Sequence, residues 1–168
     1  MMKHVTTFTI VGNHKNFHGN PLPKARLTSR QRWTDKAQQY AYWKMHVQKA
    51  FLDSLVTQTV KGAGYEVSYQ HPTGKPIHLS KIATNGGRKI EEMWAFMSVR
   101  IAWADGHHGD PENIFGSIAD ALFENDKNLF AFILPATNPE QPDGSVKVAI
   151  WIAPESELKE FANTVTSA

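Results

Sequence analysis

The chain of 168 residues contains no cysteine, so it has neither disulfides nor thiolate metal sites and is compatible with a reducing compartment. No apolar run approaches the ~18–20 residues that a membrane-spanning helix needs. The apolar stretch near the N-terminus is too short, and too interrupted by threonine, for a signal peptide. These absences predict a cytoplasmic protein without a membrane partner.

Several catalytic signatures are also missing. The sequence contains no Walker loop, no dinucleotide-binding fingerprint, no Gly-x-Ser-x-Gly elbow and no His-Glu-x-x-His motif. His107 and His108 stand close to Asp110, but adjacent histidines in a loop do not readily bind one ion without further partners. A transition-metal site is therefore the less favoured interpretation of this stretch.

The composition that remains is that of a folded domain. Hydrophobic residues make up 41% of the chain, and five tryptophans and nine phenylalanines are available for a core. A chain of this length most simply forms one domain, and no linker, repeat or low-complexity tract divides it. We therefore expect a single domain over residues 1–168.

Charge is segregated along the chain, although the net charge of +2 indicates no partner by itself. Between positions 14 and 49 the only acidic residue is Asp35, whereas between positions 105 and 128 the only Lys or Arg is Lys127. A polyanion that is bound by the basic segment and cut at metal ions held by the acidic segment would use both regions. Alternatively, the two segments simply attract each other across the fold.

Hydrophobic patterns predict the order of strands and helices. Apolar runs predict strands over residues 5–11, 65–70, 77–82, 93–103, 129–134 and 146–153. Apolar residues at helical spacing predict a long helix over 35–59, a short helix over 111–122 and a closing helix over 154–165. We expect an α+β fold of two layers, in which a mixed β-sheet packs against the long N-terminal helix and the short helix that carries the acidic residues.

The connection over residues 13–33 is long, rich in Gly, Pro and Asn, and basic. A loop of this length in a compact domain is usually functional or disordered. Its cations suit DNA phosphates, and the aromatic side chains between them suit open bases. A solvated surface loop is the structural alternative. The predicted DNA-binding cations of this loop are Lys15, Lys24, Arg26, Arg30 and Arg32.

The long helix begins after a suitable N-cap, Thr34. Tyr40 and Trp43 recur at the spacing of a buried stripe, so we interpret them as core residues, with an aromatic nucleic-acid platform as the less favoured alternative. Gln48 falls nearer the side of the helix that faces water.

The acidic stretch over residues 107–129 gathers carboxylates around the short helix. Like charges held close together repel, and a divalent cation relieves this repulsion. Carboxylate oxygens suit Mg²⁺, which could polarise a phosphodiester and activate water. Structural alternatives exist: an N-cap for Asp110, a helix-dipole partner for Glu112 and a turn residue for Asp126. Asp120 is harder to explain structurally, because its neighbours in the sequence are apolar.

These residues resemble the signature of the RusA family of Holliday junction resolvases. The family pattern is Asp-x-Asp-Asn-x-x-Lys, then Asp-Ala-Leu, then an acidic pair before a strand. Here the chain has Asp110-Pro-Glu-Asn-Ile-Phe-Gly-Ser-Ile-Ala-Asp-Ala-Leu122, followed by Asn125-Asp126-Lys-Asn-Leu129. The proline-rich segment Pro21-Leu-Pro-Lys-Ala-Arg26 and the order of elements agree as well. Residue identity is concentrated in 110–129.

The resemblance implies a homodimeric endonuclease, encoded by a bacterium or a phage, that cuts four-way junctions and other branched DNA with Mg²⁺ or, alternatively, Mn²⁺. By position in the motif it implies metal binding by Asp110, Glu112 and Asp126, which are also the catalytic residues. Asp120 would be either a further metal ligand or a residue that supports the ligands from behind. It also implies that Asn113 contacts the DNA. Glu112 replaces the usual aspartate, and the spacer before Asp126 is shorter than in the family pattern.

One position departs from the family in a way that affects chemistry. Gly116 stands where the family has a catalytic lysine, which would neutralise negative charge developing on the scissile phosphate. Either another cation replaces it, or catalysis is weak, or the protein binds junctions without cutting them. The candidate replacement cations are Lys24, Arg26, Arg100 and Lys127.

Overall fold

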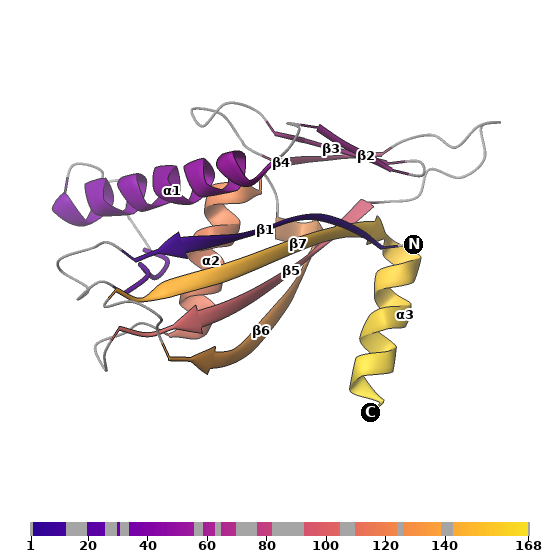
Figure 1. The fold of residues 1–168 in the computed structure, drawn as a ribbon. Helices are drawn as coiled ribbons and strands as arrows, with labels where there is room; N and C mark the ends of the chain where they lie inside the picture. Colours follow the sequence, from indigo (N-terminus) through magenta and orange to yellow (C-terminus); the bar gives the residue numbers. More distant parts are fainter. Residues whose placement is uncertain are drawn as a thin grey trace.

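The computed structural model describes residues 2–12, 20–25, 30, 34–55, 59–62, 65–69, 77–81, 93–104, 110–123, 126–138 and 143–167. Within these residues it has a four-stranded mixed sheet in the order β1-β7-β5-β6, three α-helices and a separate three-stranded sheet in the order β2-β3-β4 (Figure 1). The expected α+β class and mixed sheet are confirmed, and the arrangement is compatible with two layers.

The main sheet consists of β1 (Lys3–Val11), β7 (Ser145–Pro154), β5 (Met93–Ala102) and β6 (Leu129–Thr137). β7 pairs antiparallel with both β1 and β5, whereas β5 and β6 pair in parallel. Parallel neighbours need a crossover connection, and helix α2 (Pro111–Leu122) supplies it between β5 and β6. The acidic helix is therefore attached to the centre of the sheet through one strand and to its edge through the other.

The two faces of β5 differ in what they pack against. Ala95, Met97, Val99 and Ile101 belong to the main core, which also contains the buried sides of α1 (Asp35–Ser54) and α2. Phe96 on the other face packs with Ala153 of β7 and Leu158 of α3 (Glu155–Thr166). Both faces are apolar over this part of the strand, as the sequence of a central strand predicts.

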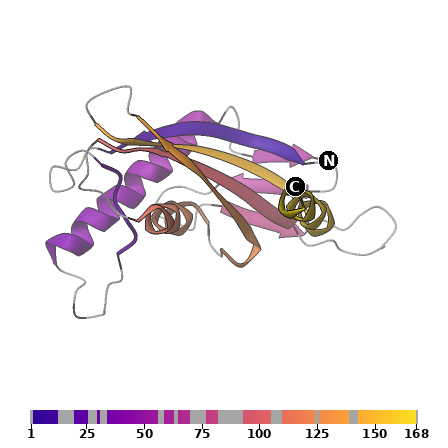
Figure 2. The ribbon, with the colours of Figure 1, turned by 90° about the horizontal axis from the view of Figure 1, so that it is seen from below.

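Helices α1 and α2 therefore lie on one face of the sheet, and α3 lies on the other. Figure 1 shows α3 at the end of the sheet where the chain begins, and Figure 2 shows that α1 extends toward the opposite end. Since α3 reaches only one end, it covers only part of its face. Among the described helices, none is long and apolar enough to cross a membrane.

The small sheet is formed by β2 (Thr59–Gly62), β3 (Tyr65–Tyr69) and β4 (Ile77–Lys81), joined by antiparallel pairing. The strands predicted over 65–70 and 77–82 are confirmed. The long helix was expected to continue to residue 59, which is wrong: it ends at Ser54, and the chain is extended at its C-cap Leu55. Residue 59 belongs instead to β2, which pairs with β3.

Burial also corrects one expectation about α1. Gln48 was placed near the wet side, but the residue is only 8% exposed. Its side-chain amide donates a hydrogen bond to the backbone carbonyl of Ala121 in α2, 2.9 Å away. Because this bond satisfies the buried polar group, Gln48 can lie between the two helices.

Candidate functional site on helix α2

Helix α2 begins with a cap that its sequence encodes. The carboxylate of Asp110 accepts a hydrogen bond from the backbone N–H of Glu112 at 3.3 Å, and Pro111 occupies the first turn. Glu112 places a second negative charge in that turn, where the helix dipole favours it. The two acids are therefore adjacent at the N-terminal end of α2, and both residues are exposed.

The body of α2 has one buried face and one polar edge. Ile114, Ile118 and Leu122 are fully buried in the main core. Asn113, Gly116 and Asp120 are three and four residues apart, which places them along one side of the helix. Asn113 and Asp120 are exposed, and Gly116 leaves a gap between their side chains.

The segment over residues 20–25 crosses this polar edge, and three contacts hold it there. The side-chain oxygen of Asn20 accepts a hydrogen bond from the backbone N–H of Ala104 at 2.6 Å. Leu22 is 4% exposed and belongs to the main core. The backbone N–H of Lys24 donates to the carbonyl oxygen of Asn113 at 2.8 Å. This part of the basic connection is thus anchored on α2, a placement the sequence did not predict.

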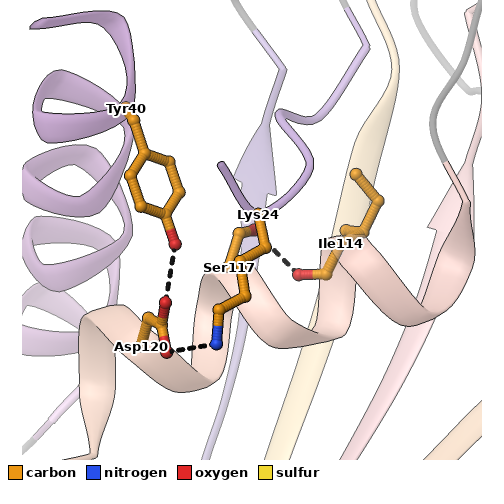
Figure 3. Close-up of polar contacts among 5 residues, drawn as sticks. All are labelled: Lys24, Tyr40, Ile114, Ser117 and Asp120. Atoms are coloured by element: carbon orange, nitrogen blue, oxygen red, sulfur yellow. Dashed lines mark hydrogen bonds and ion pairs between the residues drawn. The ribbon is translucent and has the colours of Figure 1, made fainter. Parts of the chain in front are cut away.

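The side chain of Lys24 extends from that anchor toward Asp120. Its Nζ lies 3.0 Å from Asp120 Oδ1, and the hydroxyl of Tyr40 donates to Asp120 Oδ2 at 2.9 Å (Figure 3). Lys24 comes from the basic connection, Tyr40 from α1 and Asp120 from α2. We call these three residues the Asp120 triad. The carboxylate that seemed hardest to explain from the sequence therefore has two partners.

Burial and the neighbouring carboxylate set the protonation of Tyr40. Removal from water raises the pKa of its hydroxyl well above the usual value, and the hydrogen bond to negatively charged Asp120 raises this pKa further. Tyr40 therefore remains a neutral donor at any physiological pH. Since the residue is only 5% exposed, the interpretation of Tyr40 as a core residue is confirmed.

Gly116 makes room for the stem of Lys24. A Cβ atom at position 116 would lie 3.2 Å from Cδ and 3.7 Å from Cβ of Lys24. The first distance is tighter than ordinary van der Waals contact, so any larger residue there would press on the lysine side chain. The absence of a side chain at position 116 and the presence of Lys24 beside it are thus parts of one arrangement.

Buried hydrogen bonds join α1 to α2 behind this site. The indole N–H of Trp43 donates to Ser117 Oγ at 2.9 Å, and the Ser117 hydroxyl donates to the carbonyl of Ile114 at 2.8 Å. Trp43 is 4% exposed, so its interpretation as a core residue is also confirmed. Sequence reasoning missed Ser117; the available signal was a small polar residue on the apolar stripe of α2.

Asp126 lies beyond the other end of α2. It begins the short 3-10 helix Asp126–Asn128, directly before β6, and the residue is exposed. Because α2 has 12 residues, its two ends are separated by about 18 Å. The structure therefore does not bring Asp126 together with Asp110 and Glu112.

The predicted metal ligands as a whole do not form one cluster. Among the residues that the structure describes, no three acidic or histidine side chains are grouped so that they could hold a metal ion. Asp120 already contacts Lys24 and Tyr40. The adjacent carboxylates of Asp110 and Glu112 fit Mg²⁺, which proteins usually hold through one or two carboxylates together with water and substrate phosphates.

The candidate replacement cations are placed differently. Lys24 lies against Gly116, whereas Arg100 follows Phe96 and Ser98 on the face of β5 that is turned away from α2. Lys127 lies in the 3-10 helix beyond α2. Among the candidates that the structure describes, Lys24 is thus the cation that lies beside position 116, where the family has its lysine.

The remaining predicted DNA contacts are only partly described. Arg30 and Asn113 are exposed. Lys15, Arg26 and Arg32 lie outside the described residues, as do His107 and His108.

No protein-family model matches the chain, and no curated protein matches its sequence.

Proposed function

We propose that this protein is a Mg²⁺-dependent, structure-specific endodeoxyribonuclease that hydrolyses phosphodiester bonds in Holliday junctions or other branched DNA. The contact of Lys24 with Gly116 supports this proposal most strongly. The two segments that resemble the RusA family, around residues 21–26 and 110–122, are distant in the sequence, and this contact joins them. It also puts a lysine side chain beside the position where the family has one.

Asp110 and Glu112 would hold the metal ion at the N-terminal end of α2. When bound, Mg²⁺ or Mn²⁺ would polarise the scissile phosphodiester and lower the pKa of an attacking water. The exposed amide of Asn113, one residue farther along the helix, would hydrogen-bond a phosphate oxygen. Asp126 would not bind the same ion, because it lies beyond the other end of α2.

Lys24 would supply the missing positive charge. Its backbone is anchored at Asn113 while its flexible four-carbon stem points to Asp120, so rotation of the side chain can carry the ammonium toward the N-terminal end of the helix. The side chains of Lys24 and Asp120 are 40% and 33% exposed, and a pair this exposed contributes only about 0–1 kcal/mol to stability. Exchanging Asp120 for a phosphate therefore costs little.

In this account Asp120 and Tyr40 are positioning residues. Tyr40 orients the carboxylate, and the carboxylate holds Lys24 over Gly116 when DNA is absent. Two copies of the chain in a homodimer would present two such sites and cut both strands of a symmetric junction.

The test uses a synthetic four-way junction with and without Mg²⁺. We expect paired nicks that require the metal and disappear in Asp110→Asn. Asparagine is as good an N-cap as aspartate, so this variant should keep α2 folded. Asp35→Asn, which alters the exposed first-turn acid of α1, is the matched control and should cut normally. Metal-independent nicking, or full activity in Asp110→Asn, contradicts the proposal.

A second candidate is a protein that binds branched DNA without cutting it. The observation that favours it is that the four predicted metal ligands do not come together in the described structure. The same assay separates the two functions: a shifted but intact junction in the presence of Mg²⁺ supports the binder. Absence of a shift at low salt, where phosphate contacts are strongest, excludes both.

A further inference from the structure

Among the described elements, α3 covers only one end of the sheet face that is turned away from α2. Helix α3 packs on Phe96 through Leu158 and through Phe161, whose ring lies 5.6 Å from that of Phe96. Farther along β5 toward its C-terminal end come Ser98 and then Arg100, which is exposed. In Figure 1, α3 stays at the opposite end of the sheet. No described helix covers this part of the face, and Arg100 is exposed on it.

A hollow of about 330 Å³ lies on this part of the face and crosses all the strands of the main sheet. Its described lining residues include two cations, two hydroxyls and three apolar side chains, and none of them is acidic. The lining residues are Thr7 of β1, Ser98 and Arg100 of β5, Leu134 of β6, and Lys147, Ala149 and Trp151 of β7. A hollow of this size can accommodate a nucleotide-sized group.

Two like charges face each other in the hollow. Arg100 and Lys147 are direct cross-strand partners in the register of β5 and β7, and both are exposed. Like charges directly opposite each other destabilise a sheet. Within the described residues neither side chain forms an ion pair, so the repulsion is not offset from within that part of the protein. An anion bound between them would offset it.

The other lining groups indicate which anion would fit. The guanidinium of Arg100 can donate two parallel hydrogen bonds to a phosphate, and Lys147 adds a point charge. The hydroxyl of Ser98 is a further donor for a phosphate oxygen, and the hydroxyl of Thr7, which is hydrogen-bonded to the ring of His4 at 2.8 Å, also lines the hollow. Trp151 adds an indole whose ring already packs against Phe96 and His4, with centroids 5.3 and 5.4 Å apart, and the part of this indole that lines the hollow can contact a base.

We propose that this hollow binds a phosphate and the neighbouring base of a single-stranded DNA segment. The choice of DNA rests on the proposed function; the phosphate chemistry rests on the hollow itself. Because the hollow and the acids of α2 lie on opposite faces of the sheet, it would hold a part of a branched substrate away from the bond being cut. A second copy of the chain fits this face less well, since a two-fold contact would bring the cations of both copies together.

The test is the affinity of the protein for a fluorescent single-stranded oligonucleotide, measured in EDTA so that no cutting occurs. The variant is Arg100→Gln with Lys147→Gln. The control is Lys49→Gln with Lys159→Gln, which also removes two positive charges but from lysines already paired with Asp53 and Glu155. The proposal predicts a roughly 20-fold weaker affinity near 0.1 M salt for the first variant, since each lost contact to single-stranded DNA lowers the salt slope by about 0.7. The control should bind like the unaltered protein.

Two further measurements identify the contact. Arg100→Lys keeps the charge but loses the paired hydrogen bonds, so it should recover only part of the affinity. A free mononucleotide should compete much more weakly than the oligonucleotide if a DNA strand is the ligand. The proposal is overturned if both double variants bind alike, if the mononucleotide competes equally well, or if Arg100→Gln with Lys147→Gln changes the oligomeric state instead of the DNA affinity.

The experiments distinguish failure of the proposed DNA binding in the hollow from failure of the proposed nuclease activity. If the protein binds the oligonucleotide through Arg100 and Lys147 but never nicks junctions, DNA binding in the hollow is supported and the nuclease function is contradicted. If the unaltered protein nicks junctions but both double variants bind the oligonucleotide equally well, the nuclease function is supported and DNA binding in the hollow is contradicted.

Discussion

The two ends of helix α2 carry the same kind of residue in opposite circumstances. At the N-terminal end, Asp110 and Glu112 are exposed, and Asp110 caps the backbone. Near the C-terminal end, Asp120 contacts a cation and a neutral hydroxyl. Asp110 and Glu112 form no ion pair with a described cation, so their carboxylates can bind a metal ion. Asp120, which already contacts Lys24 and Tyr40, can instead hold these two side chains in place. The sequence motif contains both kinds, and only their contacts separate them.

The largest loss of activity is expected from changes to the two acids at the N-terminal end of α2. We expect Glu112→Gln to reduce junction nicking by at least about 100-fold, because it removes the charge of one of two metal-binding carboxylates. The stability of the protein should change little, since Glu112 is exposed. Initial nicking rates at saturating Mg²⁺ and the midpoint of urea unfolding check the two statements. Normal nicking by this variant would remove Glu112 from the site.

Gly116→Ala should separate activity from stability. Alanine is more favourable than glycine inside a helix by about 0.5–1 kcal/mol, so the helix itself gains stability. Its Cβ, however, would approach Lys24 Cδ to 3.2 Å, so the lysine stem must shift by a few tenths of an ångström. We expect nicking to fall roughly tenfold, an increase of about 1.4 kcal/mol in activation free energy, while the free energy of unfolding stays equal or rises. Unchanged nicking would mean that the position of Lys24 does not matter.

Tyr40→Phe should affect the Asp120 triad without removing a charge. Loss of the hydrogen bond to the carboxylate should lower the free energy of unfolding by about 1–2 kcal/mol. The pKa of Tyr40 is higher in the folded protein than in the unfolded chain, so folding opposes its ionisation. Its contribution is therefore complete below pH ~10 and is lost as pH rises from there. Urea unfolding between pH 7 and 11 should show a steeper alkaline loss in the unaltered protein than in Tyr40→Phe.

The smallest effect is expected beyond the far end of α2. Asp126→Asn should change nicking by less than about threefold, because a change of that size corresponds to less than ~0.7 kcal/mol in the activation free energy and Asp126 is about one helix length from Asp110. Glu112→Gln is the variant to compare it with. Equal losses in the two variants would show that both acids serve one site in the DNA complex.

Much of the fold could be predicted from the sequence, because it depends on local patterns. Alternating apolar residues located the strands of the main sheet, and the burial of Phe8 and Ile10 on one side of β1 follows that alternation. The caps Thr34 and Asp110 accept hydrogen bonds from backbone N–H groups as their residue types predict. These features need only neighbours in the chain.

The arrangement of the candidate site could not be predicted in the same way. The contact between Lys24 and Asp120 joins residues 96 positions apart, and no periodicity encodes it. The burial of Gln48 depends on a carbonyl of another helix. The distance from Asp110 to Asp126 depends on how α2 crosses between two parallel strands. A motif gives the order of such residues, and the fold decides which of them meet.

We propose that Lys24 replaces the lysine that position 116 lacks, and moving the lysine from position 24 to position 116 tests this most directly. The measurement is the rate of Mg²⁺-dependent junction nicking by the unaltered protein, by Lys24→Ala, and by Lys24→Ala combined with Gly116→Lys. Lys24→Ala should lose about 100-fold, the usual effect of removing one electrostatic contact to a transition state. The double variant should recover most of that loss, because Lys24→Ala removes the Cδ atom that lies closest to position 116. A full rate in Lys24→Ala, or no recovery in the double variant when both are folded, would contradict the claim.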